Sequence, residues 1–261
     1  MSAHKSGFVN IIGNPNVGKS TLMNALVGER LSIITSKAQT TRHRILGIVS
    51  GEDFQMVISD TPGIIKPAYA LQESMMDFVK TALDDADILL YMVEIGEKGL
   101  KDERFLEKIR KIKTPVLLLI NKIDTTDQEQ LEVQVAYWKE LLPEAEIFPI
   151  SALESFNIQP VFERILELLP EGPAFFDKDQ LTDKPERFFV SEVIREKILK
   201  HYKKEIPYSV EIEVESFEEE ADIIRIGAVI MVERDSQKGI IIGHKGSALK
   251  RVGTESRKDL E

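Results

Sequence analysis

The chain of 261 residues contains no cysteine, and this absence excludes several kinds of chemistry. Without cysteine there can be no disulfide bond, no thiol catalysis and no cysteine-based zinc or iron site. The four histidines are scattered without metal-ligand spacing, which disfavours any other transition-metal site. These absences exclude a redox-thiol role and disfavour a transition-metal role for the chain.

Long hydrophobic runs are also missing. No apolar run approaches the roughly 20 residues that cross a bilayer. The opening stretch, MSAHKSGFVNIIG, lacks the basic start and unbroken apolar segment of a signal peptide. With 43% hydrophobic and 30% charged residues, the composition is that of an ordinary soluble globular protein. We therefore expect a cytoplasmic protein.

Basic residues are fewer than acidic ones, and the net charge is −10. This charge argues against a protein that coats nucleic acid indiscriminately. The C-terminal third is nevertheless patterned, with two basic clusters on either side of an acidic run at residues 211–222. On charge alone, solvated faces of helices and a strand explain this pattern as well as a binding site does. The first basic cluster comprises Arg195, Lys197, Lys200, Lys203 and Lys204, and the second comprises Lys238, Lys245, Lys250, Arg251, Arg257 and Lys258.

Short apolar runs alternate with amphipathic segments over the first two thirds of the chain. This alternation predicts an α/β domain with a mostly parallel sheet and helices on both faces, in which residues 45–50 and 54–59 pair with each other. The continuous apolar strands fit burial on both sides of the sheet. The stretch LPEGP at residues 169–173 breaks the pattern. We place the first domain at residues 1–172 and a polar linker at residues 173–184.

A second domain of α+β type is predicted for residues 185–261. Its first helix begins at TDKPER, with Asp183 or Thr182 as the cap and Pro185 in the first turn. Two strands follow, SVEIEVE and IIRIGAVIMVE, and then helical sequence on both sides of GHKG.

A glycine-and-lysine motif, GNPNVGKS at residues 13–20, follows an apolar strand and opens a helix. It matches the G-x-x-x-x-G-K-[ST] loop, whose backbone N–H groups and helix N-terminus surround phosphates. Lys19 would supply charge to the β- and γ-phosphate oxygens, and Ser20 would ligate Mg²⁺. A glycine-rich turn with a surface lysine is the alternative. The predicted phosphate contacts are Gly13, Asn14, Pro15, Asn16, Val17, Gly18, Lys19, Ser20 and Thr21.

Three further motifs follow predicted strands, at the sheet edge where open α/β folds bind ligands. DTPG at residues 60–63 places Asp60 toward the Mg²⁺ and the Gly63 N–H near a γ-phosphate. Together, the three motifs disfavour the alternative that residues 13–20 form only a glycine-rich turn with a surface lysine.

The other two motifs, NKID and SAL, indicate the base. The Asp124 carboxylate can accept hydrogen bonds from N1–H and N2–H₂ of guanine, and the Ala152 N–H could reach guanine O6. Adenine has no such paired donors, so the predicted base is guanine. The predicted base contacts are Asn121, Lys122, Asp124, Ser151, Ala152 and Leu153.

With these motifs in this order and spacing, the chain resembles the translation-factor-like branch of P-loop GTPases. GNPNVGKST, TTRHR and DTPG are similar to the group that includes the tRNA-modification GTPases and the Era family. The resemblance implies GTP and GDP as ligands with Mg²⁺, and it places TTRHR at switch I. Thr41 would ligate the Mg²⁺, with Thr40 as the alternative, and Asn16 matches an asparagine that this group associates with K⁺. The catalytic residues that it implies are Lys19, Thr41 and Gly63.

The residue after Gly63 departs from Ras-type enzymes, which carry a water-orienting glutamine there. This chain has Ile64, whose side chain cannot hydrogen-bond the attacking water. Hydrolysis must then rely on electrostatics from Lys19, Mg²⁺ and K⁺, or on groups that a partner supplies. We expect intrinsic hydrolysis on the order of 10⁻⁴ to 10⁻² per second.

The second glycine motif, GHKG at residues 243–246, has only two residues between its glycines and no hydroxyl for Mg²⁺. It is therefore not a second nucleotide loop. It resembles the G-x-x-G loop of KH domains, which clamps about four nucleotides of single-stranded RNA. A helix-capping turn is the alternative. The predicted RNA contacts are the apolar residues Ile240, Ile241 and Ile242, the loop Gly243, His244, Lys245, Gly246 and Ser247, and the cations Lys250 and Arg251.

A GTPase followed by a KH-like domain resembles the Era family over essentially the whole chain, including LTDKPERFFVSEVIREKIL. The family acts in bacterial small-subunit assembly, which implies single-stranded rRNA, the 3′ end of small-subunit rRNA, and the small ribosomal subunit as partners, and no DNA. It also implies peripheral association with the inner face of the cell membrane. Because the family's KH domain continues with a further strand and helix, we expect an incomplete, C-terminally truncated KH domain here. The alternative is a signalling or cell-cycle GTPase whose C-terminal module binds protein or membrane.

Overall fold

The computed structural model describes residues 4–261, and the chain divides into two compact units. The first unit takes in the residues up to Ser32 and Thr41–Asp183, and the second takes in Ile33–Thr40 and Lys184–Glu261. The sequence placed residues 33–40 in the first domain, whereas the structure groups them with the second unit.

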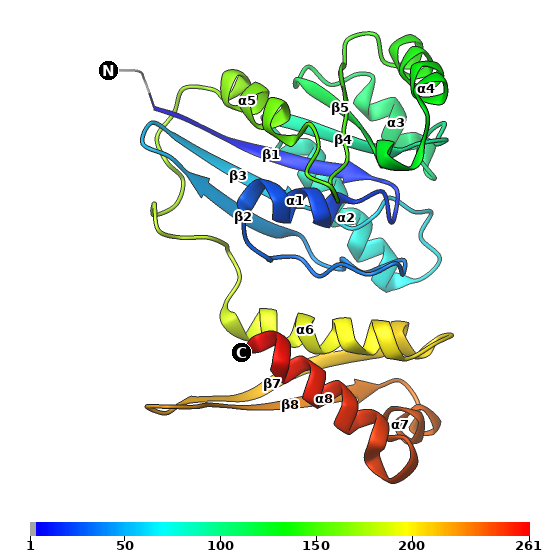
Figure 1. The fold of residues 1–261 in the computed structure, drawn as a ribbon, viewed down its shortest axis with the longest axis vertical. Coiled ribbons are helices and arrows are strands. Elements are labelled where there is room, and N and C mark those ends of the chain that lie inside the picture. The colour runs from blue at the N-terminus through cyan, green and yellow to red at the C-terminus, as the bar shows by residue number, and fades with distance from the viewer. Residues whose placement is uncertain (1–3) are drawn as a thin grey trace. The chain divides into compact units, whose positions relative to one another are not determined.

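A six-stranded sheet forms the centre of the first unit (Figure 1). The strand order is β2-β3-β1-β4-β5-β6, and every pair is parallel except β2 with β3. The predicted mostly parallel sheet is confirmed, as is the predicted pairing of residues 45–50 with 54–59, which the structure shows to be antiparallel. The strands are β1 (Lys5–Gly13), β2 (Ile45–Ser50), β3 (Phe54–Asp60), β4 (Ile88–Glu94), β5 (Val116–Asn121) and β6 (Glu146–Pro149).

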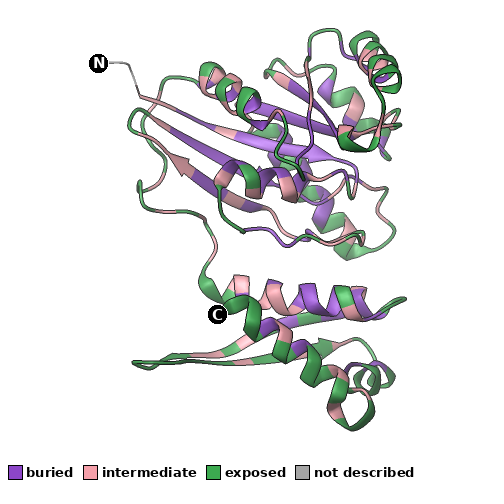
Figure 2. Ribbon diagram, viewed as in Figure 1, coloured by how far each residue is buried: buried purple, intermediate pink, exposed green. Residues whose placement is uncertain are grey.

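Helices cover both faces of this sheet (Figure 1). The face that carries α2, α3 and α4 contains a hydrophobic cluster in which Met76, Phe105 and Trp138 pack against β4 and β5. The strands β1, β3, β4 and β5 are almost completely buried (Figure 2), as their continuous apolar sequences predict. The helices are α1 (Lys19–Val27), α2 (Ala70–Asp84), α3 (Glu103–Ile109), α4 (Gln128–Leu141) and α5 (Ile158–Leu168), with a short 3₁₀ turn at Ile123–Thr125.

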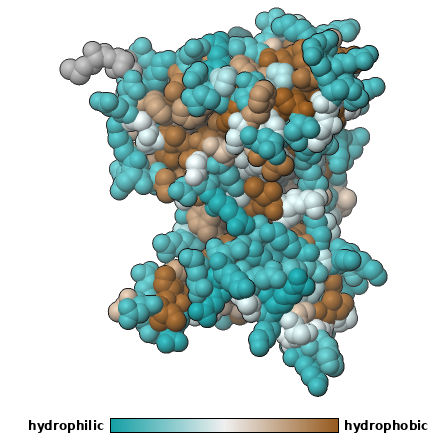
Figure 3. All heavy atoms as spheres, in the orientation of Figure 1, coloured by the Kyte–Doolittle hydropathy of each residue, from teal (hydrophilic) through white to brown (hydrophobic). Residues whose placement is uncertain are grey.

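The second unit is built from a β-hairpin and three α-helices, in the order α-β-β-α-α. Its core gathers Ile198 from the first helix, Tyr202 directly after that helix, Ile212 from the hairpin, and Ile241 and Val252 from the last two helices. Around the turn of the hairpin, apolar side chains reach the surface (Figure 3), and Ile223 and Ile224 are about half exposed. The elements are α6 (Glu186–His201), β7 (Val210–Glu219), β8 (Ile224–Val232), α7 (Asp235–Ile242) and α8 (Ser247–Leu260), with 3₁₀ turns at Ile206–Tyr208 and His244–Gly246.

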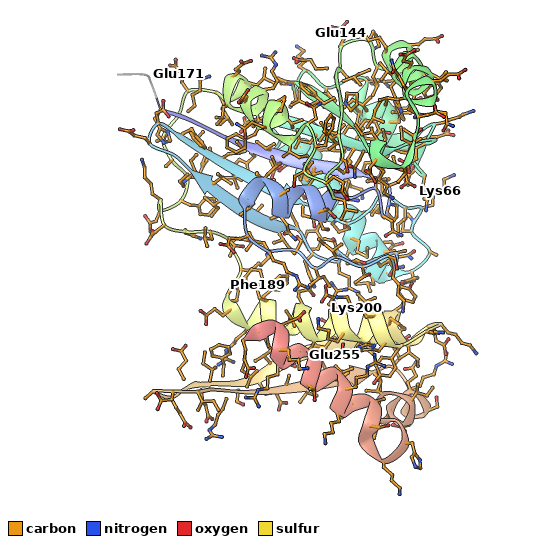
Figure 4. All side chains as sticks on the ribbon, in the orientation of Figure 1. Lys66, Glu144, Glu171, Phe189, Lys200 and Glu255 are labelled. Atoms are coloured by element: carbon orange, nitrogen blue, oxygen red, sulfur yellow. The ribbon has the colours of Figure 1, made fainter. Side chains whose placement is uncertain are left out.

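Part of the first basic cluster is structural. Arg195 and Lys197 are buried in α6, where Arg195 pairs with Glu192 at 2.5 Å and Lys197 pairs with Asp259 of α8. Glu255, which is labelled on α8 in Figure 4, likewise pairs with His201 of α6 at 2.5 Å. Buried cations are usually paired, because desolvation of an isolated charge is costly. Lys197 therefore links α6 to α8, Arg195 is paired within α6, and neither forms an exposed binding patch.

The predicted linker and helix start need correction. Residues 173–183 lie in the first unit, where Gln55 Oε1 accepts from the Phe175 and Phe176 N–H groups. Asp183 accepts from the Leu46 N–H at 3.0 Å, so it serves the edge of β2 and does not cap α6. The helix begins at Glu186 after Pro185, and no side chain caps it. No helix within residues 4–261 is long and apolar enough to cross a bilayer.

Candidate functional site

The loop at residues 13–18 connects the carboxyl end of β1 to the N-terminus of α1. Lys19 is only 6% exposed, and its Nζ donates to the carbonyls of Asn14 at 2.9 Å and Gly13 at 3.3 Å. Burial lowers the pKa of Lys19 to about 8, and the nearby carboxylates of Asp60 and Glu97 partly oppose this shift. The Lys19 ammonium group therefore donates to carbonyls of its own loop. A bound phosphate group would offer it charged acceptors, which form stronger hydrogen bonds.

Three hydroxyl and carboxylate groups meet beside this lysine. Ser20 Oγ donates to Asp60 Oδ2 at 2.7 Å and lies 3.0 Å from Thr41 Oγ1, which in turn donates to Asp60 Oδ2 at 3.2 Å. Burial raises the pKa of Asp60, and no donor among residues 4–261 reaches its other oxygen, Oδ1. The structure thus brings together the three residues that the sequence assigned to Mg²⁺.

The alternative at switch I, Thr40, lies elsewhere. Its hydroxyl donates to the Lys37 carbonyl at 2.7 Å and lies 2.7 Å from Thr35 Oγ1. Thr40 also belongs to the second unit, whereas Thr41 belongs to the first. The geometry therefore favours Thr41 over Thr40 as the switch I hydroxyl beside Ser20 and Asp60.

Gly63 closes the site at the end of the DTPG motif. A Cβ at this position would lie 2.6 Å from Pro15 Cα, so only glycine allows the two loops to approach this closely. The next residue, Ile64, donates its N–H to the Gly13 carbonyl at 3.0 Å, and its side chain is completely buried in the core under α2. As the sequence predicts, this side chain is not a candidate for orienting water.

Asn121 joins the phosphate loop to the predicted base pocket. Its Nδ2 donates to the Val17 carbonyl at 2.7 Å, and its Oδ1 accepts from the Ala152 N–H at 2.9 Å. Asp124 lies exposed nearby, and its carboxylate accepts from Ser151 Oγ at 2.6 Å. An exposed carboxylate held in one orientation is the arrangement that paired donors on guanine require.

The Ala152 N–H has a partner within the protein, and its contact with guanine O6 stays a prediction. It donates to Asn121 Oδ1, because donation to Val17 turns the Asn121 oxygen toward Ala152. The side chain of Val17 is fully buried and that of Leu153 is 76% exposed, so neither position offers a polar side-chain contact. Lys122 pairs with Glu94, and Asn16 is exposed at the turn of the phosphate loop with φ 67°.

The loop Gly243–Gly246 joins α7 to α8 in the second unit. Gly243 has φ 70° and ψ 179°, a conformation that is essentially restricted to glycine, and a Cβ there would lie 2.6 Å from Ala248 Cβ. His244 and Lys245 between the glycines are exposed, as are Ser247, Lys250 and Arg251 on α8. Ile240 and Ile242 are also exposed, at 52% and 36%.

One of the predicted RNA contacts is wrong. Ile241 is 4% exposed and packs in the core of the second unit, because successive positions of α7 face different sides. The apolar surface before the loop therefore consists of Ile240 and Ile242 alone.

The fold and the two sites define a P-loop GTPase followed by a KH domain. The family model of the 50S ribosome-binding GTPases matches residues 8–122, and that of the KH domain matches residues 205–261. The chain is 45% identical to the GTPase Era of Staphylococcus haemolyticus over 263 aligned residues, which cover 100% of this chain and 88% of that relative. The chain belongs to the Era family, and it is a GTPase that uses GTP and GDP.

Two solved structures are similar along almost the whole chain. A crystal structure of Era in complex with MgGDPNP and nucleotides 1506–1542 of 16S ribosomal RNA has a TM-score of 0.93 at 37% identity, covering 99% of this chain and 89% of that one. An Era variant from Aquifex aeolicus bound to GDP·AlF₄⁻ has a TM-score of 0.92 at 37% identity, covering 98% and 89%.

Proposed function

We propose that this GTPase binds single-stranded rRNA through the Gly243–Gly246 loop, and that it acts as a GTP-controlled switch in small ribosomal subunit assembly. The observation that carries the proposal is the loop itself, which exposes His244 and Lys245 between two glycines with positive φ. A backbone without Cβ atoms can approach a sugar-phosphate chain closely, and nearby cations supply charge for the phosphates.

The proposed RNA is the 3′ end of small-subunit rRNA. The supporting comparison is the similar Era structure, whose ligand is nucleotides 1506–1542 of 16S rRNA. The exposed Ile240 and Ile242 offer apolar surface for unstacked bases next to the loop. Such a role is consistent with a cytoplasmic location, which forms part of the proposal.

We also propose that Mg²⁺ binds at Ser20, Thr41 and Asp60. The residues fit, because their oxygen atoms already converge within 3.2 Å and Asp60 Oδ1 has no donor among residues 4–261. When bound, the ion neutralises charge that develops on the phosphate oxygens. The chain's own contributions are the Lys19 charge and the backbone N–H groups around it, and Asn16 is the proposed contact for K⁺.

Sequencing of RNA crosslinked to the full-length protein in cells tests the rRNA proposal. We expect crosslinks concentrated at the 3′ end of small-subunit rRNA and depleted in a variant with His244→Asp and Lys245→Asp. Crosslinks spread evenly over cellular RNA, or unaffected by the two substitutions, would contradict it. They would favour a signalling GTPase whose second domain binds another kind of partner.

A further inference from the structure

We infer that Glu97 is a positioning residue for GTP hydrolysis, acting on the phosphate loop through Asn14. Glu97 lies between β4 and α3, outside every nucleotide-binding motif of the sequence. Its carboxylate Oε1 accepts from Asn14 Nδ2 at 2.8 Å. Asn14 is the second residue of the phosphate loop and is 3% exposed.

Residues 97–101 provide hydrogen-bond partners for both polar atoms of the Asn14 carboxamide. Besides its bond to Glu97, Asn14 Nδ2 donates to the Gly99 carbonyl at 2.9 Å, and Asn14 Oδ1 accepts from the Lys101 N–H at 2.9 Å. Both amide hydrogens and the carbonyl oxygen therefore have partners within residues 97–101. A side chain held by three hydrogen bonds fixes the peptide unit from which it projects.

That peptide unit is the one that holds Lys19. Lys19 Nζ donates to the Asn14 carbonyl at 2.9 Å, and the Glu97 carboxylate lies close enough to oppose the lowering of the lysine pKa. Glu97 thus contacts neither the lysine nor a phosphate position directly. Instead, Glu97 fixes the position of the Asn14 peptide unit. The carbonyl of that unit in turn positions the Lys19 ammonium group.

Side chains of α4 hydrogen-bond the backbone of this segment. Gln134 Nε2 donates to the Glu97 carbonyl at 2.6 Å, and its Oε1 accepts from the Gly96 N–H at 3.3 Å. Tyr137 Oη donates to the Lys98 carbonyl at 2.7 Å, and the Glu94 N–H donates to Glu97 Oε2 at 3.1 Å. Such support makes residues 97–101 a fixed brace for the phosphate loop.

Positioning of this kind acts mainly on the chemical step. Charges and N–H groups that match the transition state must be held closely, and a displacement of about 1 Å can cost a hundredfold in rate. Ground-state binding of the nucleotide uses many contacts, in the base pocket as well as around the phosphates. Loss of the Glu97 contact should therefore lower kcat more than it raises KM.

The test is steady-state GTP hydrolysis by the full chain with Glu97→Ala, Glu97→Gln and Glu97→Asp. We expect Glu97→Ala to lower kcat about tenfold or more while KM changes less than about threefold. Glu97→Gln keeps an oxygen that can accept from Asn14, so its kcat should stay within about threefold of the parent. Glu97→Asp is one methylene short and should give an intermediate loss, and it reports on the contact if the alanine variant folds poorly.

A double-substitution cycle tests whether Glu97 acts through Asn14. In an Asn14→Ala background, Glu97→Ala should change kcat by less than about twofold, because coupled residues lose their effect only once. Glu107→Gln on α3, an exposed glutamate that pairs with Lys111, is the matched control and should leave kcat unchanged. Full additivity in the cycle, equal losses for Glu97→Gln and Glu97→Ala, or a loss confined to KM would each overturn the inference.

Discussion

Ser20 Oγ donates to Asp60 Oδ2 at 2.7 Å, although the two residues lie 40 positions apart in the chain. One belongs to the first turn of α1 and the other ends β3, so their meeting depends on the parallel pairing of β1 with β3. The contact places a hydroxyl and a carboxylate on the same side of the phosphate loop. The Mg²⁺ site that we propose rests on this pair.

Replacement of Ser20 should therefore weaken the effect of Mg²⁺ on nucleotide binding. In the Ser20→Ala variant we expect the ratio of GDP affinities with and without Mg²⁺ to shrink about tenfold or more, because one of three oxygen ligands is removed. Fluorescent GDP titrations in Mg²⁺ and in EDTA measure this ratio. Ser74→Ala, an exposed serine of α2, is the control, and an unchanged ratio in Ser20→Ala would count against the site.

Base recognition is tested at Asp124. The Asp124→Asn variant should bind GDP at least about tenfold more weakly than the parent and should bind xanthosine diphosphate more tightly. The xanthine ring has a carbonyl where guanine has an amino group. Paired titrations with the two nucleotides decide the question, with exposed Glu129→Gln as the control. If GDP binds the Asn variant as tightly as the parent, the base pocket has been assigned to the wrong residues.

Ile64 should matter for stability and little for the reaction. Since its side chain is fully buried, Ile64→Val should cost about 0.5–1.5 kcal/mol of unfolding free energy and leave kcat within about tenfold of the parent. Lys19→Ala should lose more than a hundredfold in kcat. Urea unfolding and single-turnover hydrolysis provide the two measurements. A loss above a hundredfold in Ile64→Val, with GTP binding intact, would show that this side chain takes part in hydrolysis.

Gly243 should be intolerant of a side chain. Gly243→Ala forces a Cβ to 2.6 Å from Ala248 Cβ in a backbone conformation that alanine avoids, so we expect about 1–3 kcal/mol less stability in the second unit. Gly253→Ala on α8 meets no atom within 4 Å and should be neutral or stabilising. Far-UV circular dichroism follows both units, whereas the single tryptophan, Trp138, reports only on the first. If Gly243→Ala and the parent have the same melting curve, the expected strain at this position is refuted.

Features of the fold and site that depend on short stretches of sequence could be predicted. The phosphate loop, the DTPG turn and the glycine loop at residues 243–246 each carry their geometry within a few residues, so their positions in the fold followed from strand and helix order. The brace at Glu97 could not be predicted, because it joins residues 83 positions apart and the stretch GEKGLK has no recognisable pattern. The burial of Arg195 and Lys197 was also missed, since tertiary ion pairs override the expectation that cations face solvent.

The central claim, that the Gly243–Gly246 loop binds rRNA, is tested most directly by one binding comparison. Fluorescence anisotropy of a single-stranded oligonucleotide from the 3′ end of 16S rRNA is measured with the full-length parent and with the double variant His244→Asp and Lys245→Asp, at the same moderate salt. The matched control is Gln128→Asp with Lys139→Asp on α4, which makes the same change of formal charge at exposed positions of the first unit. We predict that the loop variant binds the RNA at least about tenfold more weakly, that the control binds it like the parent, and that all three bind GTP equally. Equal RNA binding by the parent and the loop variant would contradict the account.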